Sequence, residues 1–527
     1  MYLAACAVQD DHEGDGDAMT SGTTLSKHWA DEAADDAIAS GRPVVVSSGI
    51  SPSGEIHIGN MREVLTADAV FRAVRDRGAK AAFNYVCDNM DPLRHVYPFL
   101  DATVYQPLVG RPLACIPCPC GEHPSYAEHF LEPFLASLRA LHVEVELERA
   151  DRMYGSGRMN RVIGRALSGR DRIAAILGEL TGKKIDEAWS PYNPLCPACG
   201  RITGTTVRGF SVADETVDYA CACGGSGTVP MAGGGKLTWR VDWPARWVML
   251  GVTVEPFGKD HATRGGSYDT GARIAREVFD YEPPLPVPYE WISLKGRGDM
   301  SSSKGNVLSI ATVLEVVPPE ALRYLVMRER PQRTIAFDPG LPLLQLVDEV
   351  DDATAAGADS RALELSRAAG FHPLGVPFKH LVVAAQVAGF NVDKTVEVLA
   401  RTGYTGFDRA ALALRLDHAR RWLDRHAPED IRFEVRPELP ADAAALSVDQ
   451  KAFLGRLAAS LNDTMDGEAV HLLIYDLAKA FPGSKPAELF RALYVALLGK
   501  PRGPRAGTFI AALGPGFCAA RFRQAAT

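Results

Sequence analysis

The sequence has neither an excess of basic residues nor a long apolar run. Its 57 Lys and Arg residues are outnumbered by 65 Asp and Glu residues, which gives a formal net charge of −8 at pH 7. Overall charge therefore gives no signal for nucleic-acid binding, although a local basic patch can still provide one. No apolar run reaches the roughly 18 residues that a membrane-spanning helix needs, so we expect no membrane span.

The first 20 residues lack the basic start and the apolar core of a secretion signal. They contain the acidic run DDHEGDGD, and we predict that residues 1–26 form a disordered tail. Outside this tail the chain has no low-complexity segment, and it has no internal repeat. The expected location is the cytoplasm, where cysteines bind metal more often than they form disulfides.

A strand, a glycine-rich turn and a helix are predicted in the stretch VVVSSGISPSGEIHIGN. The apolar residues 44–46 are typical of a buried parallel strand, and helical spacing follows over residues 60–77. This order is typical of sites for nucleotide phosphates, because the N-terminus of a helix favours anionic oxygens. His57 and Asn60 lie at that N-terminus and can donate hydrogen bonds to phosphate. The alternative is an ordinary strand–helix turn with a partly exposed histidine.

A serine-rich segment follows much later, in ISLKGRGDMSSSKGN. Its hydroxyls and amides suit a mobile loop that closes on a triphosphate, and Lys304 supplies positive charge. Taken alone, such a segment is more often a solvated surface loop.

Aromatic residues alternate with a carboxylate in WRVDWPARW, residues 239–247. This pattern suits a pocket for a long cationic side chain, because Asp242 can pair with an ammonium while the aromatic faces line its methylenes. The alternative is a core strand with packed tryptophans.

Seven of the ten cysteines cluster between the HIGN stretch and the serine-rich segment. Two closely spaced pairs, each followed by glycine, predict a zinc ribbon rather than free thiols. Its ligands would be Cys196, Cys199, Cys221 and Cys223. A second mixed thiolate–imidazole site is predicted in CIPCPCGEHPSYAEHF, with Cys115 left over. Its ligands would be Cys118, Cys120, His123 and His129.

The fold class predicted is an α/β Rossmann-type nucleotide-binding domain with a zinc-binding insert, followed by an all-α C-terminal domain. The catalytic domain is split between residues 27–110 and 237–310, and the insert occupies residues 111–236. Residues 311–345 form a linker, and helical periodicity predicts the all-α domain over residues 346–527.

Arginines within the insert share one face of a predicted helix. A solvated surface helix is the usual explanation, and a contact with nucleic-acid phosphates is the alternative. The residues concerned are Arg158, Arg161, Arg165 and Arg172. In the C-terminal part, candidate phosphate contacts are Arg415, Arg420, Arg421, Arg425, Lys500, Arg502 and Arg505.

In their order along the chain, HIGN and MSSSKGN resemble the two ATP-binding motifs of class I aminoacyl-tRNA synthetases. The tryptophan block resembles the class I lysyl-tRNA synthetases in particular, and the resemblance covers roughly residues 27 to 515. It continues through VPYEWISLKG, LEVVPPEALRYLVMRERP and LYVALLGKPRGPRAGTFIAALG.

The resemblance implies a monomeric enzyme that activates L-lysine with ATP and Mg²⁺ and transfers it to tRNA(Lys). The C-terminal domain would bind the anticodon, residues 311–345 would contact the tRNA stem, and Zn²⁺ would occupy the insert. The expected catalytic residues are His57, Asn60 and Lys304. The expected ATP-binding residues are His57, Gly59, Asn60, Asp260, Gly265, Gly266, Met300, Ser301, Ser302, Ser303 and Lys304. The expected lysine-binding residues are Gly49, Ser51, Trp239, Asp242, His261 and Tyr289.

The chain departs from the family at two places. The family's loop reads Lys-Met-Ser-Lys-Ser, and here Asp299 and Ser302 stand at the two lysine positions, so Lys304, Lys295 or Arg297 must supply the charge. The family often carries Asp, Cys, His and His at the second metal site, where this chain has Cys118 and Glu122 at the first two positions. The missing loop lysines keep one alternative open, a catalytically weak tRNA-binding paralogue. The other alternative is an adenylate-forming nucleotidylyltransferase with a non-tRNA acceptor, against which the predicted helical C-terminal domain argues.

Overall fold

The computed structural model describes residues 27–296, 298–300, 307–358, 360–368 and 373–527. The tail predicted at residues 1–26 and most of the serine-rich segment, Ser301 to Asn306, lie outside the described residues. None of the described helices combines the length and the apolar composition that a membrane span needs.

The catalytic part is built on a five-stranded sheet in the order β10-β9-β1-β2-β3, in which every pair is parallel. Helices α1 and α2 pack against this sheet and against one another. The predicted strand–turn–helix is confirmed, with a longer strand and a helix that starts earlier. The elements are α1 (Trp29–Ala39), β1 (Val44–Ile50), α2 (Ile58–Asp76), β2 (Ala81–Cys87), β3 (Glu146–Arg149), β9 (Val254–Gly258) and β10 (Leu285–Tyr289).

The strand order of the sheet reverses at β1. In the sheet, β2 and β3 lie on one side of β1, and β9 and β10 lie on its other side. In open parallel sheets ligands bind at the carboxyl ends of the strands at such a switch point. The site is therefore expected where β1 runs into α2.

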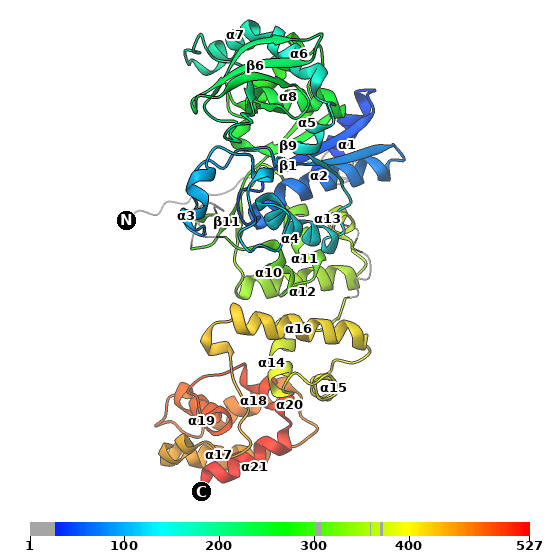
Figure 1. Ribbon diagram of the computed structural model, residues 1–527. Coiled ribbons are helices and arrows are strands. Elements are labelled where there is room, and N and C mark those ends of the chain that lie inside the picture. Colours follow the sequence, from blue (N-terminus) through cyan, green and yellow to red (C-terminus); the bar gives the residue numbers. More distant parts are fainter. Residues whose placement is uncertain (1–26, 297, 301–306, 359, 369–372) are drawn as a thin grey trace, which may run out of the picture.

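The part of the insert from α5 onward forms a lobe at the upper end of Figure 1, around a hydrophobic core to which Val241 and Ile274 of the catalytic part also contribute, whereas α4 lies in the middle of the molecule and packs into the main core. The lobe contains a three-stranded antiparallel sheet and the two-stranded pair β4–β8. β3, a strand of the central sheet, also falls within residues 111–236, so the predicted insert boundaries include part of the catalytic sheet. Apart from β3, the elements between β2 and α8 are α3 (Ala102–Tyr105), which precedes the insert, and α4 (Tyr126–Ala140), α5 (Ala150–Gly155), α6 (Asn160–Ser168), α7 (Arg170–Thr181), β4 (Tyr192–Pro194), β5 (Thr205–Ser211), β6 (Thr216–Cys221), β7 (Ser226–Pro230) and β8 (Gly235–Leu237).

The single arginine-bearing helix predicted in the insert is wrong. Helix α5 ends at Gly155, and Gly169 separates α6 from α7, so the arginines do not share one helical face. Arg158 lies between α5 and α6 and pairs with Glu148, and Arg172 pairs with Glu277.

A small sheet, β12-β11-β13, follows the central sheet and packs near α2. β13 lies inside residues 311–345, so this segment contributes to a folded unit rather than acting as a simple linker. The strands of this small sheet are β11 (Ile292–Leu294), β12 (Gly298–Asp299) and β13 (Ile335–Phe337). The helices in the same stretch of chain are α8 (Trp239–Leu250), α9 (Ser267–Glu277), α10 (Ile310–Leu314) and α11 (Pro319–Met327).

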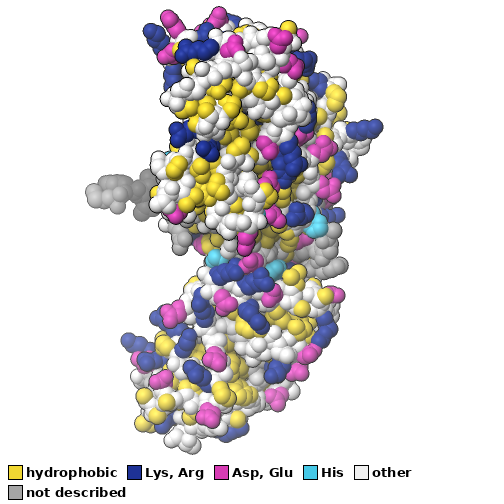
Figure 2. Space-filling model, in the orientation of Figure 1, with side chains coloured by type: hydrophobic (Ala, Val, Ile, Leu, Met, Phe, Trp, Pro, Cys, Tyr) yellow, Lys and Arg dark blue, Asp and Glu magenta, His cyan; other side chains and the backbone are white. Residues whose placement is uncertain are grey.

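Beyond β13 the described residues contain helices and no strand, as the periodicity predicted. α12 and α14 to α16 join the main hydrophobic core, and the last five helices have a core of their own. Helices α14 to α21 form the lower lobe in Figure 1, whereas α12 and α13 lie in the middle of the molecule; in Figure 2 the visible face of the lower lobe carries Lys/Arg and Asp/Glu side chains intermixed. The helices are α12 (Leu341–Ala355), α13 (Arg361–Ser366), α14 (Phe378–Val387), α15 (Val392–Arg401), α16 (Arg409–Arg425), α17 (Val448–Ser460), α18 (Gly467–Ala478), α19 (Pro486–Leu498), α20 (Ala506–Leu513) and α21 (Pro515–Ala526).

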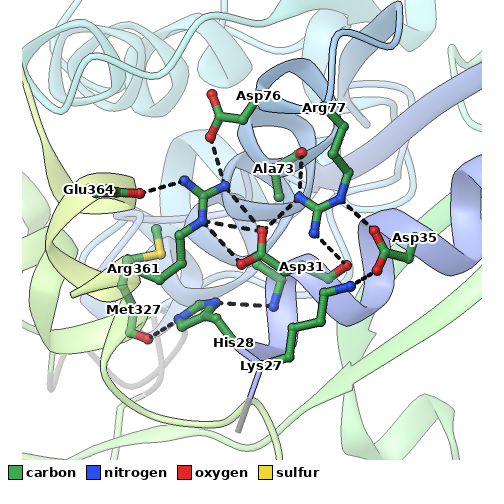
Figure 3. A network of polar contacts seen from close by, with 11 residues as sticks. Lys27, His28, Asp31, Asp35, Ala73, Asp76, Arg77, Met327, Arg361 and Glu364 are labelled. Carbon is green, nitrogen blue, oxygen red and sulfur yellow. Dashed lines mark hydrogen bonds and ion pairs between the residues drawn. The ribbon is translucent and has the colours of Figure 1, made fainter. Parts of the chain in front are cut away.

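An ion-pair network joins the first helix to the segment after the catalytic sheet (Figure 3). Asp31 on α1 accepts hydrogen bonds from Arg77, at the end of α2, and from Arg361 on α13. Arg361 also pairs with Asp76, at 2.7 Å. The network ties α1, α2 and α13 together on the side of the molecule away from the carboxyl ends of the strands.

Candidate active site

His57 and Asn60 cap the helix that leaves β1. The ring Nδ1 of His57 accepts a hydrogen bond from the Gly59 amide at 3.1 Å, and the Asn60 side-chain oxygen accepts one from the His57 amide at 3.2 Å. Burial lowers the pKa of His57 to about 4, so the ring is neutral at pH 7. Because Nδ1 acts as an acceptor, Nε2 carries the proton and can donate to a phosphate oxygen.

The two sequence motifs lie together. The Ile58 amide donates to the Leu308 carbonyl at 3.1 Å, and His57 forms a β-bridge with Ser309. On the other side of the serine-rich segment, the Met300 side chain lies 3.6 Å from where a Cβ on Gly59 would stand. Both ends of that segment are therefore held at the start of α2, although Ser301, Ser302, Ser303 and Lys304 are outside the described residues.

The turn after β9 contains the other predicted nucleotide-binding residues. Asp260 is exposed in a short 3₁₀ helix, Lys259–His261, and Gly265 has a left-handed backbone with φ of +72°. A Cβ on Gly265 would stand 2.2 Å from the Leu180 carbonyl oxygen, and one on Gly266 would stand 2.6 Å from two carbonyl oxygens. Close backbone approach therefore requires both glycines, and the turn places Asp260 beyond the carboxyl end of β9, a neighbour of β1.

A pocket opens between β1, β9 and α8. Four of the six predicted lysine-binding residues line it: Gly49, Ser51, Trp239 and His261. Trp239 stacks on Trp243 with ring centroids 5.4 Å apart, and His261 lies 5.5 Å from the Trp243 ring. The walls are therefore aromatic, as the tryptophan block predicted, but the block forms helix α8 and not a strand.

Asp242, which the sequence suggested as the partner of a substrate ammonium, instead pairs with side chains of the protein. Its side chain is fully buried outside the pocket lining, and its Oδ1 accepts a hydrogen bond from the Tyr154 hydroxyl at 2.6 Å. Its Oδ2 pairs with Arg246 and, at 3.3 Å, with Lys236. Since two cations already neutralise this carboxylate, it is not the pocket's partner for a substrate ammonium.

Three carboxyl groups line the pocket, those of Glu63, Asp88 and Glu255, and Asp88 is already paired with Lys236 and Arg246. Glu63, on α2, is half-buried. It accepts hydrogen bonds from the Gly49 amide at 2.9 Å, the Ser48 hydroxyl at 3.0 Å and the Tyr289 hydroxyl at 2.9 Å. Burial raises its pKa. Tyr289 does not line the pocket, but its hydroxyl contacts Glu63, which does.

Glu255, on β9, is the other carboxyl group of the pocket lining that has no ion-pair partner. It is 5% exposed, its Oε1 accepts a hydrogen bond from the Trp243 indole at 2.8 Å, and its Oε2 has no hydrogen-bond partner. Burial raises its pKa to about 8, and the nearby carboxyl group of Glu63 adds to the rise. Among the described residues neither Glu63 nor Glu255 forms an ion pair, so the pocket offers two acids without a cationic partner to a cation.

Both predicted cysteine-containing clusters assemble. In the first, the ligand atoms of Cys196, Cys199, Cys221 and Cys223 lie within 4.8 Å of one another, and two of the sulfur pairs are 3.7 Å apart. Tetrahedral zinc with Zn–S bonds of about 2.3 Å requires sulfur separations of about 3.8 Å. In the second, Cys118, Cys120, His123 and His129 converge equally closely, and the exposed Cys115 is not among them.

Five of the predicted phosphate contacts have polar partners within the protein. Arg421 pairs with Asp417, Arg425 with Glu315 and Arg505 with Glu468, and these three side chains stay partly exposed. Arg415 is buried in α16 and pairs with Asp351 at 2.9 Å, so it cannot reach a phosphate. Lys500 donates to the Arg432 carbonyl at 2.8 Å while remaining exposed.

The parallel sheet interrupted by an insert, with the two ATP motifs joined at the start of α2, defines a class I aminoacyl-tRNA synthetase. A family model described as "tRNA synthetases class I (K)" matches residues 27–372. Lysine–tRNA ligase 1 of Methanosarcina acetivorans is 49% identical over 95% of this chain and 98% of its own length. Lysine–tRNA ligase of Archaeoglobus fulgidus is 48% identical over 94% of this chain and all of its own. The chain belongs to the class I lysyl-tRNA synthetase family.

Proposed function

We propose that this chain is a lysine–tRNA ligase: it forms lysyl-adenylate and pyrophosphate from lysine and ATP, then moves the lysyl group to the 3′ end of tRNA(Lys). The observation that carries this proposal is the pair of acids without an ion-pair partner, Glu63 and Glu255, in an aromatic pocket beside the ATP motifs. The names of the relatives support the same activity.

The pocket fits the side chain of lysine. A buried ammonium needs a compensating carboxylate, because an unpaired buried charge is strongly unfavourable. Glu255 and Glu63 supply that charge, and the rings of Trp239 and Trp243 can cover the methylenes and attract the cation. A glutamate side chain would instead place a third acid beside these two.

Adenylation needs positioning and charge stabilisation more than a strong base, since the substrate carboxylate itself attacks the α-phosphorus. We assign phosphate binding to the Nε2–H of His57, the side-chain amide of Asn60 and the N-terminus of α2. Mg²⁺ would be held mainly by the ATP phosphates. We further propose that both cysteine-containing clusters bind Zn²⁺ as structural sites.

Lysine binding should release a proton below pH 8. With the pocket empty, Glu255 has a pKa near 8 and is largely protonated at pH 7. A bound ammonium favours the carboxylate and lowers that pKa, so affinity rises as pH increases through 7 and levels off above about 8. Calorimetric titrations at pH 7 in buffers of different ionisation enthalpy measure the protons released. 2-Aminohexanoate, which lacks the side-chain ammonium, is the control and should release none; equal release by both ligands would contradict this assignment.

Lys304→Ala should slow adenylate formation with little change in ATP affinity. The loss of one preorganised cation from the transition state costs about 2–4 kcal/mol. Single-turnover formation of lysyl-adenylate is the measurement. Lys295→Ala is the matched control, because Lys295 is 66% exposed and lies 3.4 Å from Asp338. A wild-type rate of adenylate formation in Lys304→Ala, together with a slow rate in Lys295→Ala, would show that Lys295 and not Lys304 supplies the cation.

The substitutions at Asp299 and Ser302 favour the weak tRNA-binding paralogue as the second candidate. Such a paralogue would bind tRNA without exchanging pyrophosphate into ATP in the presence of lysine. A nucleotidylyltransferase with another acceptor would not need the helical C-terminal lobe. Cytoplasmic location, a monomeric state and anticodon binding by residues 346–527 stay predictions.

A further inference from the structure

Arg62, in the second turn of α2, is a buried cation without an ion-pair partner. It is 1% exposed, and burial lowers the pKa of its guanidinium to about 10, so the group stays charged at pH 7. Among the described residues it forms no ion pair, and its Nε is buried without a hydrogen-bond partner. A charge taken out of water is costly unless an opposite charge lies beside it. We therefore expect the guanidinium to serve something other than stability.

The two terminal nitrogens of Arg62 join α2 to a part of the chain far away in sequence. Nη1 donates to the Trp291 carbonyl at 3.3 Å, and Nη2 donates to the carbonyls of Arg330 and Pro331 at 3.2 and 3.0 Å. Trp291 immediately precedes β11, and the other two residues lie in the loop before β13, which pairs with β11. Arg62 therefore ties α2 to the small sheet from which the serine-rich segment emerges.

None of these three carbonyls depends on Arg62 for a hydrogen bond. Each also accepts one from a backbone amide: Ile335 donates to Trp291 at 3.1 Å, Glu290 to Pro331 at 2.8 Å and Arg333 to Arg330 at 3.0 Å. An apolar side chain at position 62 would leave all three carbonyls with a partner. The hydrogen bonds of Arg62 therefore fix the position of α2 relative to the small sheet, which the backbone pairing alone does not do.

The two elements that Arg62 joins carry the two ATP motifs. The HIGN motif begins α2, and the hairpin of β11 and β12 runs through Met300 into the serine-rich segment. The exit of that segment is held at the start of α2, where the Ile58 amide donates to the Leu308 carbonyl. On the entry side, the hydrogen bonds of Arg62 hold the small sheet against the same helix. A shift of the sheet along α2 would change the distance between the two motifs.

We propose that Arg62 is a positioning residue for adenylation, which holds the hairpin before the serine-rich segment at the distance from α2 at which both ATP motifs contact one triphosphate. This inference rests on the proposed function. In this role Arg62 acts through the motifs and needs no contact with the substrate. Misplacement of reacting groups by about 1 Å can lower a rate about a hundredfold, so the loss of this tie should slow the step that uses the triphosphate.

The two steps of the reaction separate this role from a structural one. Adenylate formation uses the triphosphate of ATP and both motifs, whereas transfer of the lysyl group from lysyl-adenylate to tRNA releases AMP and involves no pyrophosphate. Arg62→Met should slow single-turnover adenylate formation by roughly tenfold to a hundredfold. Transfer from chemically prepared lysyl-adenylate to tRNA(Lys) should stay within about twofold of wild type, because that transition state does not use the tie.

Arg75→Met is the matched control, because Arg75 is an exposed arginine of the same helix and its loss should change neither step. Arg62→Lys keeps the charge but has one nitrogen in place of two, so it should recover only part of the adenylation rate. A purely structural Arg62 would lower the melting temperature and slow both steps alike. If Arg62→Met does not fold, the comparison of the two steps in Arg62→Lys decides the assignment.

The inference is overturned if both variants at Arg62 form adenylate at the wild-type rate, or if adenylation and transfer slow equally. A failure of the proposed function gives a different result, because the wild-type protein would then form no lysyl-adenylate from lysine and ATP, with or without tRNA.

Discussion

Glu255→Gln should raise the KM for lysine by two to three orders of magnitude. Breaking a buried ion pair by removing one partner costs about 3–5 kcal/mol, because the other charge stays buried without compensation. The variant should still fold, since glutamine can accept the same hydrogen bond from Trp243 and the acid that it replaces is largely protonated in the empty pocket.

ATP–pyrophosphate exchange at increasing lysine concentration measures this effect. Glu282→Gln is the matched control, because Glu282 is an exposed glutamate that pairs with Arg276 on the surface. A KM within a few-fold of wild type in Glu255→Gln would show that the ammonium is bound elsewhere, and Glu63→Gln would be the next variant.

Cys199→Ser should remove one zinc ion per chain and destabilise the insert. Structural zinc sites of this kind contribute on the order of 10 kcal/mol of apparent binding free energy, which is available only to the folded state. The ribbon adjoins β4 and β8, so loss of its metal should also loosen the strand that carries Lys236.

Metal analysis of the purified protein, combined with limited proteolysis of the insert, tests this prediction. Cys115→Ser is the control, because Cys115 is an exposed thiol outside both clusters and its loss should change neither readout. Unchanged zinc content in Cys199→Ser would refute the ribbon site.

Local sequence signals predicted the elements and motifs that depend on neighbours in the chain. The strand, turn and helix around His57 follow from apolar patterning and from the cap, and both cysteine clusters follow from ligand spacing. The joining of Met300 and Ser309 to the start of α2 could be expected only from the family resemblance, because no local rule relates segments so far apart.

The acids that define the pocket could not be predicted in this way. Glu63 has the appearance of an ordinary polar residue on a helix, and Glu255 stands in a short strand whose other residues are apolar. The sequence predicted Asp242 as the carboxylate that binds the substrate ammonium, because it lies between tryptophans. In the structure, helix α8 directs Asp242 away from the pocket, toward Lys236 and Arg246. Which carboxylate is left without a cation is decided by tertiary pairing.

The most direct test of the account is ATP–pyrophosphate exchange by the purified protein with each amino acid in turn, with and without tRNA. The account predicts exchange with lysine far above that with arginine or glutamate, because only lysine places its ammonium between Glu63 and Glu255. Equal exchange with glutamate, or no exchange with lysine under either condition, would contradict it.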